Sequence, residues 1–237
     1  MNRADEGRHL PKAAAWEERW WFDSAAADIG VMASLILRPA ERVAWWAAAL
    51  VRTGEPLVSI TATDVGIPAR GLEVRTDGIW ACLTCETPGS HWTVGLEAYA
   101  VALDDPFDAW SGARGVLVPF GLDLEWEAEA DVEWRGDGYG QHCRVSGDVL
   151  LGSERIELTS AGHRRHRWGP PERGWDLAGP TTWVSGTGPA PEAFEPSHWS
   201  PVRWPDGDEI NASGRIGGDG WGWVSGPGTS LPPRSPG

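Results

Sequence analysis

The residues with the clearest chemical potential lie between Gly162 and Gly169, in the stretch GHRRHRWG. His166 and Trp168 are two positions apart, so on a strand their side chains point to the same face. A histidine beside an indole on an inward face combines a proton donor with a π surface. Such a pair can protonate an alkene or a carbonyl, and the indole can stabilise the cation that forms. A purely structural histidine, hydrogen-bonded at the mouth of a barrel, explains the same pattern.

The same cluster contains His163 and three arginines. Alternation along a strand places Arg165 and Arg167 on the face opposite His166. A further acidic candidate is Glu97, which lies in the middle of an apolar predicted strand. Glu97 either assists as a general acid or base or forms an ion pair with an arginine, and the ion pair is the favoured interpretation.

Other chemistry finds little support in the sequence. Cys82 and Cys85 form a lone CxxC pair, whereas a zinc site needs four ligands. On a strand these two cysteines also point to opposite faces. The sequence contains no nucleophile-elbow motif, no P-loop and no dinucleotide-binding motif followed by a helix. We therefore expect neither a metal nor a cofactor.

The elements that must position these residues are predicted to be strands. Residues 122–132 alternate between apolar side chains and five carboxylates, which indicates one packed face and one solvated face. Segments 72–76 and 79–84 flank Asp77-Gly78, a pair typical of hairpin turns. Residues 43–51 read as a strand, although their alanines also suit a helix. Helical periodicity is scarce, so the chain is predicted to be all-β and mostly antiparallel.

Composition narrows the function further. The chain has 237 residues, a formal net charge of −14 and three cysteines. Such negative charge disfavours binding to nucleic acid, and no apolar run is long enough for membrane insertion. A cytoplasmic location is the default expectation. The 17 tryptophans are typical of an apolar ligand cavity. The indoles predicted to bind substrate are Trp21, Trp46, Trp80, Trp92, Trp126 and Trp183.

Several ordered motifs resemble a known group of proteins. They are CETP at 85–88, HWTVGLEA at 91–98, LDDP at 103–106, FGLDLEW at 120–126, GQHCRVSG at 140–147 and GHRRHRWG at 162–169. Together they resemble the lipocalin-like superfamily of AttH and carotenoid 1,2-hydratase, in an actinobacterial branch of unknown function. The resemblance covers roughly residues 16–185.

The resemblance implies two tandem lipocalin-like antiparallel β-barrel domains, at residues 16–112 and 113–225. Residues 1–15 are expected to be a disordered leader and residues 226–237 a disordered tail. The short C-terminal part, rich in proline and glycine, leaves open an incomplete second barrel.

The resemblance also implies a function. In the hydratases, the histidine and tryptophan that match His166 and Trp168 are implicated in acid catalysis, without a redox cofactor. We therefore expect a small hydrophobic ligand, terpenoid or polyketide-like, and its hydration, cyclisation or isomerisation, with Glu97 assisting. The family's usual aspartate is replaced by Arg165, so the carboxylate that orients the histidine is missing from the motif. A carrier without turnover and a degenerate paralogue that serves only in assembly are the alternatives.

Overall fold

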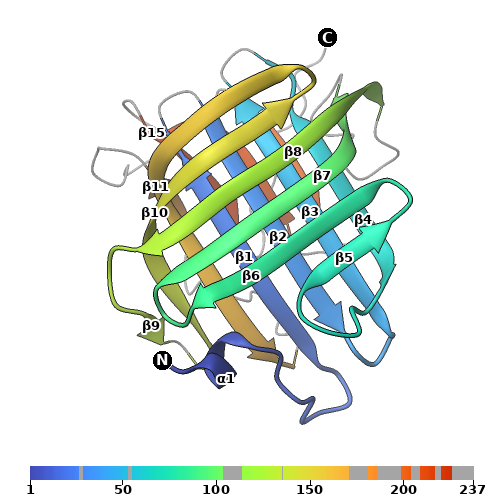
Figure 1. The fold of residues 1–237 in the computed structure, drawn as a ribbon, viewed down its shortest axis with the longest axis vertical. Coiled ribbons are helices and arrows are strands. Elements are labelled where there is room, and N and C mark those ends of the chain that lie inside the picture. Colours follow the sequence, from blue (N-terminus) through green and yellow to red (C-terminus); the bar gives the residue numbers. More distant parts are fainter. Residues whose placement is uncertain are drawn as a thin grey trace.

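A computed structural model of the chain describes residues 1–26, 29–52, 55–103, 114–134, 136–170, 181–185, 199–203, 209–216 and 220–225. Almost all of its regular structure is antiparallel β-sheet, so the predicted all-β class is confirmed (Figure 1). One short helix, α1, spans Arg3–Glu6. Within the described ranges, no helix is long and apolar enough to cross a membrane.

The strands form two sheets. The larger contains β1 (Glu17–Ala25), β2 (Ile29–Arg38), β3 (Val43–Arg52), β4 (Val58–Gly66), β5 (Glu73–Thr76), β6 (Ile79–Thr87), β7 (His91–Leu103), β8 (Gly115–Ala128), β9 (Glu133–Trp134), β10 (Gly138–Leu151) and β11 (Glu154–Gly169). The smaller contains β12 (Thr181–Ser185), β13 (Trp199–Arg203), β14 (Glu209–Ile216) and β15 (Gly220–Ser225). The predicted hairpin at Asp77-Gly78 joins β5 to β6, and residues 43–51 are strand rather than helix.

The larger sheet curls until its bonding closes into a ring. Its order is β4-β3-β2-β1-β11-β10-β8-β7-β6-β5, and β4 also pairs with the C-terminal end of β7 through Val58–Ala102 and Ser59–Val101. Closure of this kind removes exposed sheet edges and encloses an interior lined by alternate residues of every strand. Strands from both predicted domains, 16–112 and 113–225, build this one sheet. The boundary between tandem domains therefore stays a prediction.

Alternation sorts the side chains of the barrel wall as the sequence predicts. On β8, Leu124 and Trp126 are buried in the interior, whereas Asp123 and Glu125 are exposed on the outer face. The solvated interpretation of the acidic stretch is thus confirmed, because ionised carboxylates crowded in an apolar interior would be costly.

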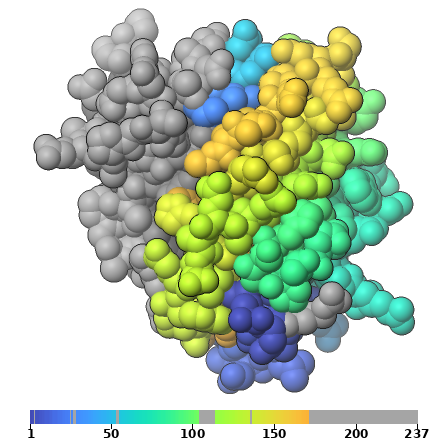
Figure 2. All heavy atoms as spheres, turned by 60° about the vertical axis from the view of Figure 1, so that its left-hand side comes forward, coloured from blue at the N-terminus to red at the C-terminus, as the bar shows by residue number. Residues whose placement is uncertain are grey.

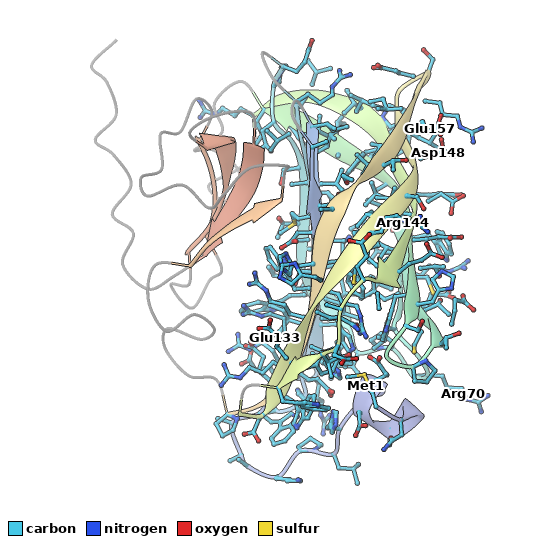
Figure 3. All side chains as sticks on the ribbon, turned by 90° about the vertical axis from the view of Figure 1, so that its left-hand side faces the viewer. Met1, Arg70, Glu133, Arg144, Asp148 and Glu157 are labelled. Atoms are coloured by element: carbon cyan, nitrogen blue, oxygen red, sulfur yellow. The ribbon has the colours of Figure 1, made fainter. Side chains whose placement is uncertain are left out.

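The outer face of β1, β2 and β3 is apolar as well. Trp21, Ile36 and Trp45 belong to a second buried cluster that is separate from the interior. The smaller sheet lies beside these three strands (Figure 3). Strands covered on both faces need apolar residues at consecutive positions, which explains the unbroken run from Val43 to Val51.

The N-terminal segment, which the sequence predicts to be a leader, contains α1 and buries one of its side chains. Asn2 caps α1 by accepting hydrogen bonds from the Ala4 and Asp5 main chain, and Glu6 is only 2% exposed. Figure 2 shows this segment, in dark blue, packed at the lower end of the barrel. Residues 10–15 are all exposed, and the expectation that residues 1–15 form a disordered leader stays a prediction. The predicted tail, 226–237, lies outside the described residues.

Gly162 allows a close approach between β1, β10 and β11. A Cβ atom at this position would lie 2.4 Å from Val145 Cγ2 and 2.5 Å from the Asp23 main-chain oxygen. That oxygen accepts a hydrogen bond from Trp126 Nε1 at 3.1 Å. Moving it away from the added Cβ atom would therefore weaken this hydrogen bond. Gly162→Ala should lower the free energy of unfolding by about 1–3 kcal/mol, measured by urea denaturation.

Gly140 provides the matched control for this substitution. Its Cβ would meet nothing closer than Arg165 Cγ at 3.8 Å, which is ordinary contact. Gly140→Ala should therefore change stability by less than about 0.5 kcal/mol. Equal losses in the two variants would show that Gly162 is not required for close packing.

Candidate functional site

His166 faces the interior of the barrel from β11. It lies opposite Trp20 of β1 and Tyr139 of β10 in the strand register. Its ring stacks on the Trp20 indole with centroids 4.4 Å apart, and only 1% of the residue is exposed. Trp168 lies on the same face with its ring centroid 4.9 Å away. The predicted pairing of these two side chains is therefore present.

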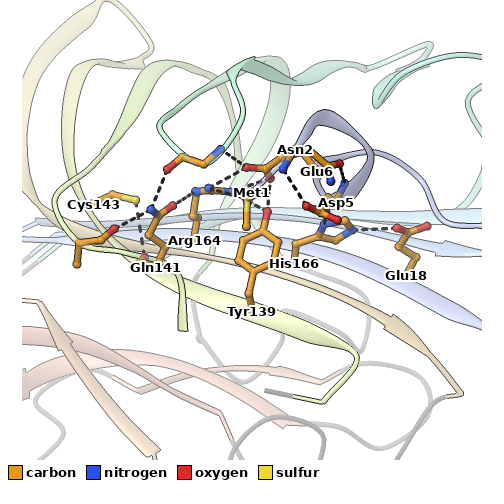
Figure 4. Close-up of polar contacts among 12 residues, drawn as sticks. Met1, Asn2, Asp5, Glu6, Glu18, Tyr139, Gln141, Cys143, Arg164 and His166 are labelled. Atoms are coloured by element: carbon orange, nitrogen blue, oxygen red, sulfur yellow. Dashed lines mark hydrogen bonds and ion pairs between the residues drawn. The ribbon is translucent and has the colours of Figure 1, made fainter. Parts of the chain in front are cut away.

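The carboxylate that the motif lacks comes from another strand. Glu18 Oε1 of β1 lies 2.9 Å from His166 Nε2 (Figure 4). The same oxygen lies 2.7 Å from His9 Nδ1, and the His9 main-chain N–H donates to Glu18 Oε2 at 2.9 Å. His9 also stacks on Trp168, with centroids 3.7 Å apart. Glu18 thus takes the orienting position that Arg165 cannot fill.

Sequence reasoning missed Glu18, although one pattern could have revealed it. Glu18 precedes Trp20 by two positions, so the two share a face of β1, and Trp20 is apolar and buried. A carboxylate on the packed face of a strand needs a partner. The partner itself, His166, is 148 residues away, and only the β1–β11 pairing brings the two residues together.

Hydrogen bonding sets the number of protons that Glu18 and His166 share. His166 Nδ1 lies 3.2 Å from the Asp5 main-chain oxygen, which can only accept, so Nδ1 carries a hydrogen. His166 Nε2 then either accepts from a protonated Glu18 or, as an imidazolium, donates to a Glu18 carboxylate. Both arrangements contain one exchangeable proton between the two groups and no net charge.

Burial favours the arrangement in which both groups are uncharged. Desolvation raises the pKa of Glu18 to about 8, even though the His9 main-chain bond and Arg8 oppose the rise. Desolvation likewise holds the pKa of His166 well below its ordinary value, helped by the nearby His9. At neutral pH Glu18 therefore holds a proton inside the barrel, bonded to a neutral His166.

This proton pair predicts a distinctive pH profile of stability. Glu18 and His166 in the unfolded chain release protons around pH 4.5 and 6.5. Between these values folded and unfolded chains each hold one proton on the pair, so it contributes no pH dependence. From pH 6.5 to about 8 only the folded pair stays protonated, so stability falls as pH rises, by about 1.4 kcal/mol per pH unit. Below pH 4.5 the unfolded chain gains a second proton, and stability falls as pH decreases.

Urea denaturation between pH 5 and 8.5 measures this profile. The control is the double variant Glu18→Gln/His166→Asn, which removes both titrations and leaves every other titrating group in place. The wild type should lose stability relative to this control above pH 6.5. A wild-type profile parallel to the control would contradict the shared proton.

Beside His166 lies a second buried polar group, Arg164. It points inward from the same strand and is 2% exposed. Its guanidinium forms two hydrogen bonds of 3.0 Å with the Glu6 carboxylate, and its Nε donates to Gln141 Oε1 at 2.8 Å. Tyr139 contacts both groups, since its hydroxyl donates to Glu6 and accepts from Arg164. Burial raises the pKa of Tyr139, so it remains a phenol.

His163, the other histidine of the predicted cluster, lies on the opposite face. Its main-chain N–H donates to Asp23 at 3.2 Å, and its Nε2 lies 3.1 Å from His142 Nε2. Desolvation lowers the pKa of His163 to about 2 and raises that of Asp23 to about 7. The β11 alternation therefore separates His163 from the inward site around His166.

One group of side chains has the composition of a metal site. The ligand atoms of His9, Glu18 and His166 all lie within 4.8 Å of one another. Glu18 Oε1 is, however, hydrogen-bonded directly to a nitrogen of each histidine. A cation would have to separate these atoms and displace the shared proton. The arrangement fits a proton relay better than a metal centre.

The six predicted substrate-binding tryptophans divide between different surfaces. Trp46, Trp92 and Trp126 are buried in the interior cluster. Trp21 belongs to the outer apolar cluster, and Trp80 is half-buried on the outer face, against Gly95. The side chain of Trp183 lies outside the described residues. Alternation turns Trp21 and Trp80 away from the interior, and their role in substrate binding stays a prediction.

Glu97 is also on the outer face. It is exposed on β7, where its neighbours Leu96 and Ala98 point to the packed side. The structure thus separates Glu97 from His166, and the assisting role of Glu97 stays a prediction. The carboxylate in contact with His166 is that of Glu18.

Some interior indoles have polar atoms without a partner. Within the described part of the chain, the indole N–H groups of Trp20, Trp46 and Trp92 are buried and make no hydrogen bond. A buried donor without an acceptor is costly, so such groups favour a guest that carries an oxygen or another acceptor.

Comparison with known proteins agrees with this architecture. The model of the family described as "Domain of unknown function (DUF7064)" matches residues 2–228. A crystal structure from Nitrosomonas europaea, of a protein provisionally assigned as AttH, has a similar fold at 14% sequence identity. The match has a TM-score of 0.51 and covers 94% of this chain and 68% of that one. No curated protein sequence matches the chain. The similarity supports an AttH-like fold.

Proposed function

We propose that this chain, which belongs to the DUF7064 family, binds a small hydrophobic molecule in its barrel and transfers a proton to it. The observation that carries the proposal is the 2.9 Å contact between Glu18 Oε1 and His166 Nε2, which is buried beside the Trp20 indole. The reaction class is a hydration, cyclisation or isomerisation, which needs no redox cofactor.

The geometry supports a specific proton route. When a substrate replaces the Asp5 carbonyl at His166 Nδ1, that nitrogen donates its proton to an alkene or carbonyl of the substrate. Glu18 simultaneously gives its proton to His166 Nε2 and becomes a carboxylate. The substrate becomes a cation, and the charges balance. Trp20 and Trp168 flank His166, where their π faces stabilise that cation until it takes up water or loses a proton. The released proton then returns the pair to its starting state.

A carrier role is the second candidate. It is favoured by the engagement of both His166 nitrogens, with Glu18 and with Asp5, and by the buried indole N–H groups. A carrier needs these donors to hold a ligand and needs no proton transfer.

Native mass spectrometry of the full chain, purified from its own host, distinguishes the two roles. We expect the spectrum to show an apolar molecule that the protein retains. The protein should convert this molecule to a product of equal mass, or of a mass greater by one water. Return of the molecule unchanged would favour the carrier. Loss of conversion with a chelator and recovery with Zn²⁺ would instead make His9, Glu18 and His166 a metal centre.

Binding in the interior has its own test with the neutral fluorescent probe N-phenyl-1-naphthylamine. Trp46→Leu should change the affinity for the probe at least fivefold, because this indole faces the interior. Trp80→Leu is the matched control, since Trp80 lies on the outer face. Equal changes in both variants would contradict an interior binding site.

A further inference from the structure

Arg164 is a buried cation whose carboxylate partner comes from outside the sheet. The guanidinium projects into the barrel from β11, two positions before His166 and on the same face. The carboxylate belongs to Glu6, at the end of α1. Figure 4 shows Glu6 reaching Arg164 from α1, beside Tyr139 and Gln141 of β10.

Four donors converge on this one carboxylate. Arg164 Nη1 and Nη2 each donate at 3.0 Å, one to each oxygen of Glu6. The Gly89 main-chain N–H donates to Oε1 at 2.6 Å, and the Tyr139 hydroxyl donates to Oε2. A bidentate guanidinium binds a carboxylate strongly and with a specific geometry, and the two further donors add to this preference. We call these three residues, Gly89, Tyr139 and Arg164, the carboxylate recess.

The recess is held in place without Glu6. Arg164 Nε donates to Gln141 Oε1 at 2.8 Å, and Gln141 Nε2 in turn donates to the main-chain oxygens of Gly89 and Ala130 at 2.9 and 2.7 Å. The guanidinium also lies 5.1 Å from the centroid of the Tyr139 ring. Strands β10 and β11 and the β6–β7 turn therefore organise the donors.

Glu6, in contrast, belongs to a segment that is not itself part of the sheet. The four-residue helix α1 is joined to β1 through the exposed residues 11–15. This segment also supplies the Asp5 carbonyl at His166 and the His9 ring at Glu18. Residues 1–9 thus cover the recess and the proton pair together, so a ligand that displaces them gains access to both.

We propose that the carboxylate recess binds the carboxylate of an apolar acid, and that Glu6 occupies the recess until this ligand replaces it. The inference rests on the proposed function and names its ligand class. The carboxylate would be held at Arg164 while the apolar body enters the barrel, and a reactive carbon a few bonds from the carboxylate would lie beside His166.

Titration with cis-parinaric acid and with its methyl ester, followed by fluorescence, tests the proposal. Glu6→Ala should bind the acid at least tenfold more tightly than the ester, because the recess then lacks its internal carboxylate. The wild type should bind the acid at least tenfold more weakly than Glu6→Ala, since Glu6 must first be displaced. Glu6→Ala/Arg164→Met should bind acid and ester equally.

A second measurement covers the risk that Glu6→Ala, with its uncompensated cation, folds poorly. Propionate should raise the Tm of Glu6→Ala by several degrees, whereas propionamide should not, and neither should shift the wild type. Glu6→Gln serves as the conservative variant and should show the same preference for propionate with a smaller shift.

The outcomes separate the two proposals. If Glu6→Ala bound the acid and the ester equally and propionate did not raise its Tm, the carboxylate site would be overturned. Binding of the ester would, in that case, still support the proposed hydrophobic site in the barrel. Binding of neither compound by any variant would overturn both.

Discussion

Glu18→Gln is expected to slow conversion of the host-derived substrate by about 100- to 10,000-fold, the usual contribution of a positioned acid or base. The amide keeps the size of the side chain and can still hydrogen-bond to His166. It cannot, however, supply the proton that Nε2 must receive when Nδ1 gives its own to the substrate. Affinity for the substrate should change by less than about threefold. Single-turnover kinetics separates these two quantities.

Glu97→Gln is the matched control for this experiment. Glu97 is a glutamate of the same barrel wall, but it is exposed on the outer face of β7. Its replacement should leave conversion unchanged. Equal loss of activity in both variants would show that Glu18 is not the proton source.

Replacing one partner of the buried ion pair between Glu6 and Arg164 should lower the free energy of unfolding more than any other substitution proposed here. Both side chains are almost fully buried, at 1% and 2% exposure. Glu6→Leu or Arg164→Met alone leaves an unpaired charge in the barrel and should cost about 3–5 kcal/mol of unfolding free energy. The double variant removes both charges and should lose much less than the sum of the single losses.

Urea denaturation of the four proteins completes this double-mutant cycle. Asp148 and Arg155 provide the control, because they form a bidentate pair in the same β10–β11 hairpin but lie on the outside. Replacing either Asp148 or Arg155 should lower the free energy of unfolding far less than replacing one partner of the buried pair. Additive losses at Glu6 and Arg164 would mean that the two groups do not depend on each other.

Local patterns predicted much of the fold. Alternation at residues 122–132 predicted the inner and outer faces of β8 correctly as far as Ala128, where the strand ends, and Asp77-Gly78 located the β5–β6 turn. The same rule could have placed Trp80 and Glu97 on the outer face, because the apolar neighbours of each occupy the inner positions. Trp21 is a harder case, since β1 has buried residues on both faces.

Two of the four main residues of the candidate site could not be predicted from local sequence patterns. His166 and Trp168 could be identified because their spacing places them on one face of a strand. Glu18 and Glu6 reach the site only through pairing between β1 and β11 and through the packing of α1, and their partners are 148 and 158 residues away. Local periodicity carries no information on contacts at such separations.

NMR of selectively labelled protein between pH 5 and 9 tests the shared proton of Glu18 and His166 most directly. We expect ¹⁵N shifts of a neutral His166 with hydrogen on Nδ1, and a Glu18 ¹³C shift of a protonated carboxyl up to about pH 8. An ionised Glu18 beside a His166 that is unprotonated at Nδ1 at pH 7 would contradict the account, because Nδ1 would then have no proton to donate and Glu18 none to pass to Nε2.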